Sequence, residues 1–112
     1  MHMIEAIVKP SSIDGVKSKL AQIGVLGMTA TEVKGFGKQK GHTERYRGGR
    51  MDVGFVPKVS LKIAVKSEDL DKALEAITTA ARTGNVGDGK IFVYEISKVV
   101  RIRTGEADND AL

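Results

Sequence analysis

The sequence has no cysteine and no tryptophan, and its two tyrosines and three phenylalanines are its only aromatic residues. Without cysteine there is no disulfide framework, no thiolate metal site and no thiol nucleophile. No apolar run reaches the roughly 18 residues of a membrane-spanning helix, and no segment resembles a secretory signal peptide. These absences predict a soluble, cytoplasmic protein whose core is built from aliphatic side chains.

The length and hydrophobic content of the chain are sufficient for one small domain. The chain has 112 residues, of which 41% are hydrophobic, and its formal net charge is +4. A chain of this length can form a two-layer core but has little material for a deep, self-contained active site. We therefore expect residues 1–112 to form a single domain. The positive charge is compatible with nucleic acid, an anionic small ligand or a protein partner.

The apolar pattern predicts two β-α-β units joined by a long loop. Strands are expected over residues 3–9, 28–34, 59–65 and 91–96, with an extra strand over 98–102. Ser12 or Ser11 should cap a first helix that ends at Gly24, and Ser67 should cap a second helix. This order predicts an α+β fold, a ferredoxin-like βαββαβ sandwich with both helices on one face of a four-stranded antiparallel sheet.

Such a sandwich leaves the second face of its sheet uncovered. The expected residues of that face include Ile7, Ile91 and Val93, or their chain neighbours if the register differs by one. A small sheet with an apolar uncovered face usually buries that face in an oligomer. The pattern therefore predicts self-association.

A glycine-rich stretch over residues 82–90 is the strongest chemical signal. Three glycines fall within six residues and Lys90 follows them, so the backbone can bend closely around a ligand. Arg101 and Arg103 lie two apart on the expected last strand, which would put both side chains on one face about 6.5–7 Å apart. Amide, ammonium and guanidinium groups together suit a polyphosphate. The pattern favours nucleotide binding over a plain hairpin connection.

Residues 36–57 show neither helical nor strand periodicity, and they carry five basic and two acidic side chains. So long an irregular segment in a small domain is usually functional or disordered. Gln39, whose amide can ligate a metal or bind a carboxylate, lies near its start. The alternative is a solvated hairpin extension without a specific role.

Several motifs resemble the P-II nitrogen-regulatory signal-transduction family, of the GlnB or GlnK type. They are GFGKQKGHTERYRG (35–48), RTGNVGDGKIFV (82–93) and RIRTGE (101–106), with TATEVK (29–34) and Pro57-Lys58 also in place. The resemblance runs nearly end to end. It implies a regulatory loop over 36–57, a phosphate loop over 82–90 and a C-terminal segment over 101–112.

The resemblance also implies a homotrimer with ATP or ADP bound in the clefts between subunits. The matching nucleotide-binding positions are Thr29, Gly37, Lys38, Gln39, Ile63, Ala64, Gly87, Asp88, Gly89, Lys90, Arg101 and Arg103. Arg101 and Arg103 would meet the phosphates from the same side of the cleft as Lys90. The positions matching a 2-oxoglutarate site are Gln39, Lys40, Gly41, Lys58 and Gly87. Gln39 would also help to ligate Mg²⁺. No catalytic residue is expected, and the chain should not be an enzyme.

Through the long loop, the resemblance implies control of a partner protein in nitrogen metabolism. Tyr46 and Arg47 are the expected contacts, and an ammonium channel is the favoured partner, which would recruit the protein to the membrane. Glutamine-synthetase regulators or another nitrogen-metabolism protein are alternatives, and no direct contact with nucleic acid is expected.

The chain departs from the family pattern at several positions. Met51 stands where uridylylated members carry tyrosine, and Gly49 where phosphorylated members carry serine, so we expect no modification at these sites. Arg50 and Lys62 occupy positions that are frequently acidic.

Two other function classes are weaker. A nucleic-acid-binding protein would explain the basic loop, but it would leave the Gly-Asp-Gly-Lys turn at 87–90 unexplained, and the loop lacks interleaved aromatic residues. A slow nucleotide hydrolase would explain the phosphate site, but the sequence offers no clear catalytic base.

Overall fold

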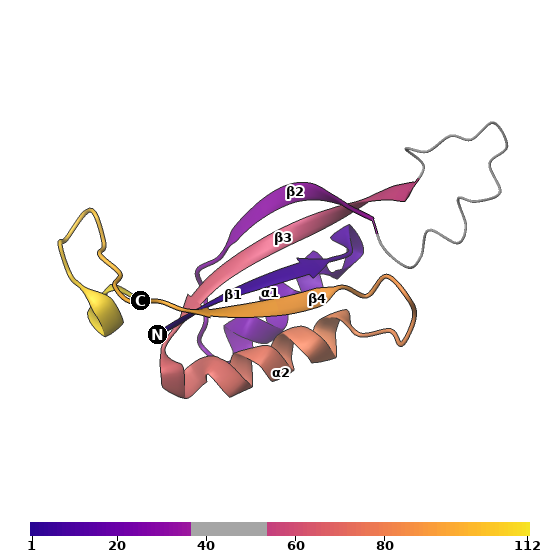
Figure 1. The fold of residues 1–112 in the computed structure, drawn as a ribbon. Helices are drawn as coiled ribbons and strands as arrows, with labels where there is room; N and C mark the ends of the chain where they lie inside the picture. The colour runs from indigo at the N-terminus through magenta and orange to yellow at the C-terminus, as the bar shows by residue number, and fades with distance from the viewer. Residues whose placement is uncertain (37–53) are drawn as a thin grey trace, which may run out of the picture.

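The computed structural model describes residues 1–36 and 54–112 (Figure 1). The strands are β1 (His2–Val8), β2 (Thr29–Phe36), β3 (Phe55–Val65) and β4 (Lys90–Glu95). The helices are α1 (Ile13–Gln22) and α2 (Leu70–Ala81), and the short 3-10 turns are η1 (Pro10–Ser12), η4 (Ser67–Asp69) and η5 (Asp108–Ala111). β2 and β3 extend into the expected irregular segment over 36–57 at both ends, and residues 37–53 of that prediction lie outside the described residues.

The strands form one sheet in the order β2-β3-β1-β4, and every neighbouring pair is antiparallel. Both helices cover the same face of this sheet and pack against each other (Figure 1). Each helix connects two strands that do not pair with each other, as the βαββαβ order requires. The expected ferredoxin-like fold is therefore confirmed.

The core lies between the sheet and the helices and is aliphatic, as the composition predicts. Its fully buried side chains are Ile4, Ala6, Val16, Leu20, Leu61, Ile63, Ala73 and Ile77. On β1 and β3 they occupy every second position, and on α2 they recur at helical spacing, so each element contributes one apolar face. Burying one such Leu or Ile side chain contributes about 1.5–3 kcal/mol.

The helix starts differ from the expected serine caps. Ser12 precedes α1, but its side chain makes no capping hydrogen bond. The Ser67 hydroxyl accepts a hydrogen bond from the N-terminal ammonium of Met1 at 2.9 Å, and Asp69 is the residue that precedes α2. At its other end α1 stops as predicted, where Gly24 adopts a left-handed φ of 85°.

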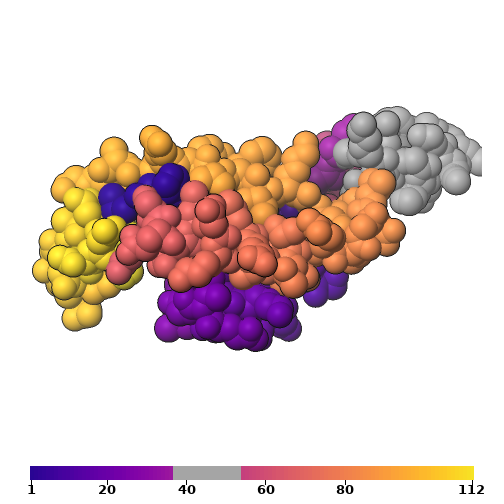
Figure 2. Space-filling view, turned by 90° about the horizontal axis from the view of Figure 1, so that it is seen from below, coloured from indigo at the N-terminus to yellow at the C-terminus, as the bar shows by residue number. Residues whose placement is uncertain are grey.

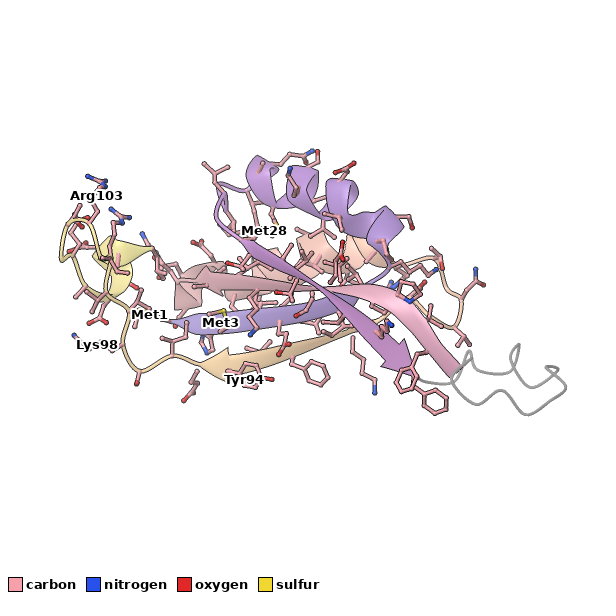
Figure 3. All side chains as sticks on the ribbon, turned by 90° about the horizontal axis from the view of Figure 1, so that it is seen from above. Met1, Met3, Met28, Tyr94, Lys98 and Arg103 are labelled. Atoms are coloured by element: carbon pink, nitrogen blue, oxygen red, sulfur yellow. The ribbon has the colours of Figure 1, made fainter. Side chains whose placement is uncertain are left out.

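The uncovered face of the sheet, here called the open face, does contain Ile7, but the placement of Ile91 and Val93 on it is wrong. Val93 pairs with Ile4 and Ile91 with Ala6, so both point to the helix side. The open-face positions of β4 belong to Phe92 and Tyr94, which are 45% and 52% exposed. Figure 3 shows Tyr94 projecting away from α1. The face is therefore aromatic rather than aliphatic at this edge.

The expected strand over 98–102 is also wrong. After β4 the chain leaves the sheet, and residues 99–108 fold back on themselves through a single bridge between Val100 and Ala107. The amide of Arg101 donates to the Glu106 carbonyl at 2.9 Å, and a turn covers residues 102–104. The amides of Arg101, Gly105 and Asp108 all donate to carbonyls within this segment, which projects at one end of the molecule (Figure 2).

Candidate functional site

The glycine-rich loop over 82–90 is organised by the carboxylate of Asp88. It accepts hydrogen bonds from the Thr83 hydroxyl at 2.5 Å, from the Thr83 amide at 2.7 Å and from the Gly84 amide at 2.8 Å. The Lys9 ammonium adds an ion pair at 3.2 Å. The hydrogen bonds from Thr83, followed by those from Gly84 and Lys9, hold the pKa of Asp88 well below its usual range. Asp88 therefore fixes the loop as an ionised acceptor.

The end of this loop lies directly on β1. Gly87 and Gly89 have φ values of 106° and 110°, which side chains rarely tolerate. A Cβ on Gly89 would lie 1.9 Å from the carbonyl oxygen of Ile7. Only glycine fits there, and Lys90, which opens β4, is thereby held at a fixed place beside the loop.

Lys58 approaches the same loop from β3. It is 7% exposed, and its ammonium donates to the Gly87 carbonyl at 2.5 Å. Burial, and secondly the charge of Lys9, lower the pKa of Lys58, while Asp88 opposes the shift. Within residues 1–36 and 54–112 no carboxylate lies within ion-pair distance of Lys58. This end of the sheet, with Lys58 and residues 87–90, is called the loop end.

A second group of expected site residues lies at the other end of the sheet, here called the C-terminal end. It comprises Thr29 at the start of β2, Ala64 near the end of β3, and Arg101 and Arg103. A cavity of about 690 Å³ is lined by Thr29, Ala64 and Arg101, together with Met3 and Met28, which Figure 3 labels. The side chain of Ile63 is fully buried on the helix side, so only its backbone can border a ligand here.

The two arginines do not lie on a strand, so the expectation that they share one strand face is wrong. Arg101 donates to the Glu106 carboxylate at 2.7 Å and to the Ala111 carbonyl at 3.3 Å. Arg103 lies in the turn that follows and is exposed at the tip of the C-terminal loop (Figure 3). The Glu106 carboxylate thus holds the first arginine in place, whereas the second faces solvent.

The loop end and the C-terminal end lie at opposite ends of the sheet (Figure 1). β4 begins at Lys90 beside the loop and runs for six residues before the C-terminal segment starts, a span of about 17 Å at about 3.4 Å per residue. Within one chain, Lys90 therefore cannot share a phosphate group with Arg101 or Arg103. The expectation that all three act from the same side is wrong, because residues close in sequence are separated by the full length of a strand.

A family model described as "Nitrogen regulatory protein P-II" matches residues 1–106. The chain belongs to this family. The P-II protein of Pasteurella multocida is 54% identical and that of Rhizobium etli 56% identical, each over 112 residues that cover 100% of both chains. Nitrogen regulatory protein P-II 1 of Escherichia coli K12 is 52% identical with the same coverage.

A solved structure agrees with these relatives. The crystal structure of Arabidopsis thaliana PII bound to citrate superposes with a TM-score of 0.82 at 40% identity, covering 99% of this chain and 91% of that one. The relatives are named as nitrogen regulatory proteins, so this P-II family member belongs to a signalling family rather than to an enzyme family.

Several expected site residues of this P-II chain lie outside the described residues. They are Gly37, Lys38, Gln39, Lys40, Gly41, Tyr46, Arg47, Gly49 and Met51. Within the described ranges no group of three His, Cys, Asp or Glu side chains could hold a metal ion, and no helix is long and apolar enough to cross a membrane. Phe36 and Phe55 flank the undescribed segment, and their ring centroids lie 5.6 Å apart.

Sequence reasoning missed Lys9, whose ion pair with Asp88 ties the end of β1 to the loop. The two residues are 79 positions apart, and a lysine before a proline carries no signal of such a partner.

Proposed function

We propose that this P-II family member senses nitrogen, carbon and energy supply by binding ATP or ADP, with 2-oxoglutarate, in clefts between the subunits of a homotrimer. The observation that carries the proposal is the separation of the loop end from the C-terminal end. We assign half of the nucleotide site to each end, and a second copy would supply the missing half. The site is then complete only where two copies meet.

The loop end suits phosphate and carboxylate groups. Gly87 and Gly89 let the backbone approach a ligand closely, and Lys90 adds a positive charge beside them. Lys58 is a buried ammonium whose described acceptor is a neutral carbonyl, an arrangement that an anionic ligand would improve. We assign Lys58 and Gly87, with Gln39, Lys40 and Gly41, to 2-oxoglutarate. The citrate bound to Arabidopsis PII is likewise a polycarboxylate, which supports this assignment.

The C-terminal end suits the rest of a nucleotide. The Thr29 hydroxyl and the apolar Ala64 line its cavity, which can take an adenine ring, and Arg101 and Arg103 can take phosphate oxygens. In the proposed trimer these residues come from the subunit next to the one that supplies Lys90. Gly37 and Lys38 would close over the nucleotide.

The proposed site includes a Mg²⁺ ion, and this ion would not need a cluster of protein carboxylates. Bound Mg²⁺ would link phosphate oxygens to the 2-oxo acid group of 2-oxoglutarate. The described residues offer no acidic cluster for a metal. Gln39, which the family resemblance implies as a ligand, is the residue that we assign to the ion. ADP lacks the γ-phosphate, so the site can distinguish the two nucleotides and report carbon supply at the same time.

The open face provides the surface on which copies would pack. The Tyr94 hydroxyl donates to the Glu5 carboxylate at 3.1 Å, and the Ser60 hydroxyl donates to its other oxygen at 3.2 Å. Phe92 and Ile7 lie on the same face. A face with an exposed aromatic edge and a hydrogen-bonded centre is typical of surfaces that become buried on association.

The long loop would carry the output of this sensor. Tyr46 and Arg47 are the proposed contacts with the partner, and we favour an ammonium channel, with which the cytoplasmic protein would meet the membrane. Glutamine-synthetase regulators and other proteins of nitrogen metabolism are alternatives. A pull-down from native extract, with ADP in one arm and Mg-ATP plus 2-oxoglutarate in the other, identifies the partner.

Calorimetry tests the core of the proposal. Mg-ATP and 2-oxoglutarate should each raise the affinity for the other by the same factor, about 5–150-fold for couplings of 1–3 kcal/mol. Gln39→Ala should abolish this coupling while ADP binding persists. Light scattering should give three chains per particle. Independent binding of the two ligands, or a monomer that binds ATP fully, would contradict the scheme.

A further inference from the structure

The turn over residues 101–106 closes on the carboxylate of Glu106. One oxygen of this carboxylate, Oε1, accepts a hydrogen bond from Nη1 of Arg101 at 2.7 Å and another from the Thr104 hydroxyl at 3.0 Å. The Glu106 amide donates to the Thr104 hydroxyl oxygen at 3.2 Å, and the Gly105 amide donates to the Arg101 carbonyl at 2.8 Å. The turn itself therefore holds the carboxylate in place beside the arginine.

A second acceptor holds the other terminal nitrogen of the same guanidinium. Nη2 of Arg101 donates to the Ala111 carbonyl at 3.3 Å, and both residues line the cavity of about 690 Å³ at the C-terminal end. A guanidinium carries five N–H groups in a rigid plane. Two are used by Glu106 and Ala111, so three have no acceptor within residues 1–36 and 54–112. The plane is thus fixed at the cavity wall while donors remain for a ligand.

The ion pair between Arg101 and Glu106 contributes little to the stability of the fold. The two side chains are 38% and 48% exposed, and exposed ion pairs add little because both groups are well solvated. A free arginine side chain, in contrast, loses much rotamer freedom when a ligand immobilises it. Because the orientation of Arg101 is set before binding, most of that cost is avoided. The contact should therefore affect a ligand at Arg101 more than it affects folding.

We infer that Glu106 is a positioning residue, whose carboxylate oxygen orients the Arg101 guanidinium for the nucleotide phosphates before they bind. The inference rests on the proposed function, which assigns phosphate oxygens to Arg101. Glu106 touches no ligand in this scheme, and it lies outside the set of nucleotide-binding positions that the family resemblance implies. Its negative charge repels phosphate, so its contribution is an acceptor at a fixed place and not its charge.

Three substitutions separate the acceptor from the charge. Glu106→Gln keeps an acceptor oxygen at the same reach without the charge, Glu106→Asp keeps the charge on a shorter side chain, and Glu106→Ala removes both. Glu75→Ala on the exposed side of α2 is the matched control, because it also removes one carboxylate. ATP and adenosine are titrated into each protein by calorimetry, and light scattering checks assembly. If Glu106→Ala does not assemble, the comparison of Glu106→Asp with Glu106→Gln decides.

Glu106→Ala and Glu106→Asp should each weaken ATP by about 2–12-fold, the range for immobilising one flexible side chain on binding. The affinity for adenosine should not change, because adenosine has no phosphate. Glu106→Gln should recover most of the ATP affinity. In an Arg101→Met background, Glu106→Ala should have no further effect, since Glu106 acts only through that arginine.

Unchanged or stronger ATP binding in Glu106→Ala would overturn the inference, because the carboxylate would then play no part or would only compete with phosphate. An equal loss in Glu106→Gln, for adenosine or in Glu75→Ala would also overturn it. A loss that persists in the Arg101→Met background would assign Glu106 to the turn alone. If the unaltered protein binds no ATP, the proposed function itself fails.

Discussion

Replacing Lys58 with methionine separates its role in ligand binding from its role in folding. Methionine keeps an unbranched stem of similar length and removes the ammonium, so the packing around position 58 is largely retained. In the folded chain this ammonium is 7% exposed and donates to the Gly87 carbonyl at 2.5 Å. Its removal should therefore affect an anion at the loop end much more than it affects the fold.

The expected change in the free energy of unfolding is the sum of two opposing contributions. Loss of the hydrogen bond leaves the Gly87 carbonyl without this donor and costs about 1 kcal/mol. Loss of the buried charge is favourable, because burial lowers the pKa of Lys58 and so disfavours the protonated form in the folded state. That unfavourable contribution is fully present below the folded-state pKa of Lys58, and it disappears as pH rises from there through the higher pKa of the unfolded chain. The free energy of unfolding should therefore change by less than about 1 kcal/mol.

Binding of 2-oxoglutarate should change far more. The carboxylate would lose a charge-assisted hydrogen bond worth about 1.5–3 kcal/mol, which corresponds to about a 10–150-fold weaker affinity. The assay is calorimetric titration of 2-oxoglutarate in the presence of Mg-ATP, with urea unfolding of the same samples. Lys19→Met, on the exposed side of α1, is the matched control, because it also removes one lysine charge. Unchanged 2-oxoglutarate affinity in a folded Lys58→Met protein would refute the assignment of Lys58.

Four further outcomes are expected. Gly89→Ala should destabilise the fold by about 3 kcal/mol in urea unfolding, because its Cβ would meet the Ile7 carbonyl and its φ is positive; a neutral result would contradict the close approach. Asp88→Asn should lower the urea midpoint near neutral pH. Because the folded pKa of Asp88 is lowered, its contribution is present above the unfolded value and lost as pH falls through the folded one, so the two proteins should converge only in strong acid. Arg103→Ala should weaken ATP by roughly 1.5–3 kcal/mol in calorimetry, and loss of the trimer at unchanged affinity would make it structural. Intact-mass measurement on protein from nitrogen-starved and nitrogen-replete cells should show no uridylyl or phosphoryl group, since Met51 offers no hydroxyl for the first and Gly49 none for the second; a stoichiometric adduct in either sample would overturn this.

The buried face of a strand could be predicted where apolar and polar side chains alternate. The prediction failed where the side chains do not alternate. Residues 59–66 largely alternate between apolar and polar, which gave the buried face of β3 correctly, although the strand begins earlier than predicted, at Phe55. Residues 91–94 are all apolar or aromatic, so the sequence contains no information about which of them face the helices. The pairing of β4 with β1 decides this, and that pairing is a long-range property.

In the candidate site, too, local features could be predicted from the sequence and long-range distances could not. The glycines of residues 82–90 could be recognised locally, because positive φ angles and close approach require them. The distance between Lys90 and Arg101 could not be predicted from the local sequence, since it depends on whether residues 98–102 continue in the sheet. Val99 and Val100 favour a strand, but the segment finds its hydrogen bonds within residues 99–108 instead.

β3 extends beyond the part of the sheet in which it pairs with β1. β1 pairs with it only as far as Val59, so residues 55–58 are held by β2 alone, as a two-stranded ribbon that ends at Phe36 and Phe55. Two-stranded ribbons are usually more strongly twisted than larger sheets. Lys58 lies where this ribbon joins the wider sheet, next to Val59, the last residue of β3 that pairs with β1. A partner that contacts the end of this ribbon and an anion that binds at Lys58 would therefore act on the same two strands, and any coupling between the two binding events would be equal in both directions.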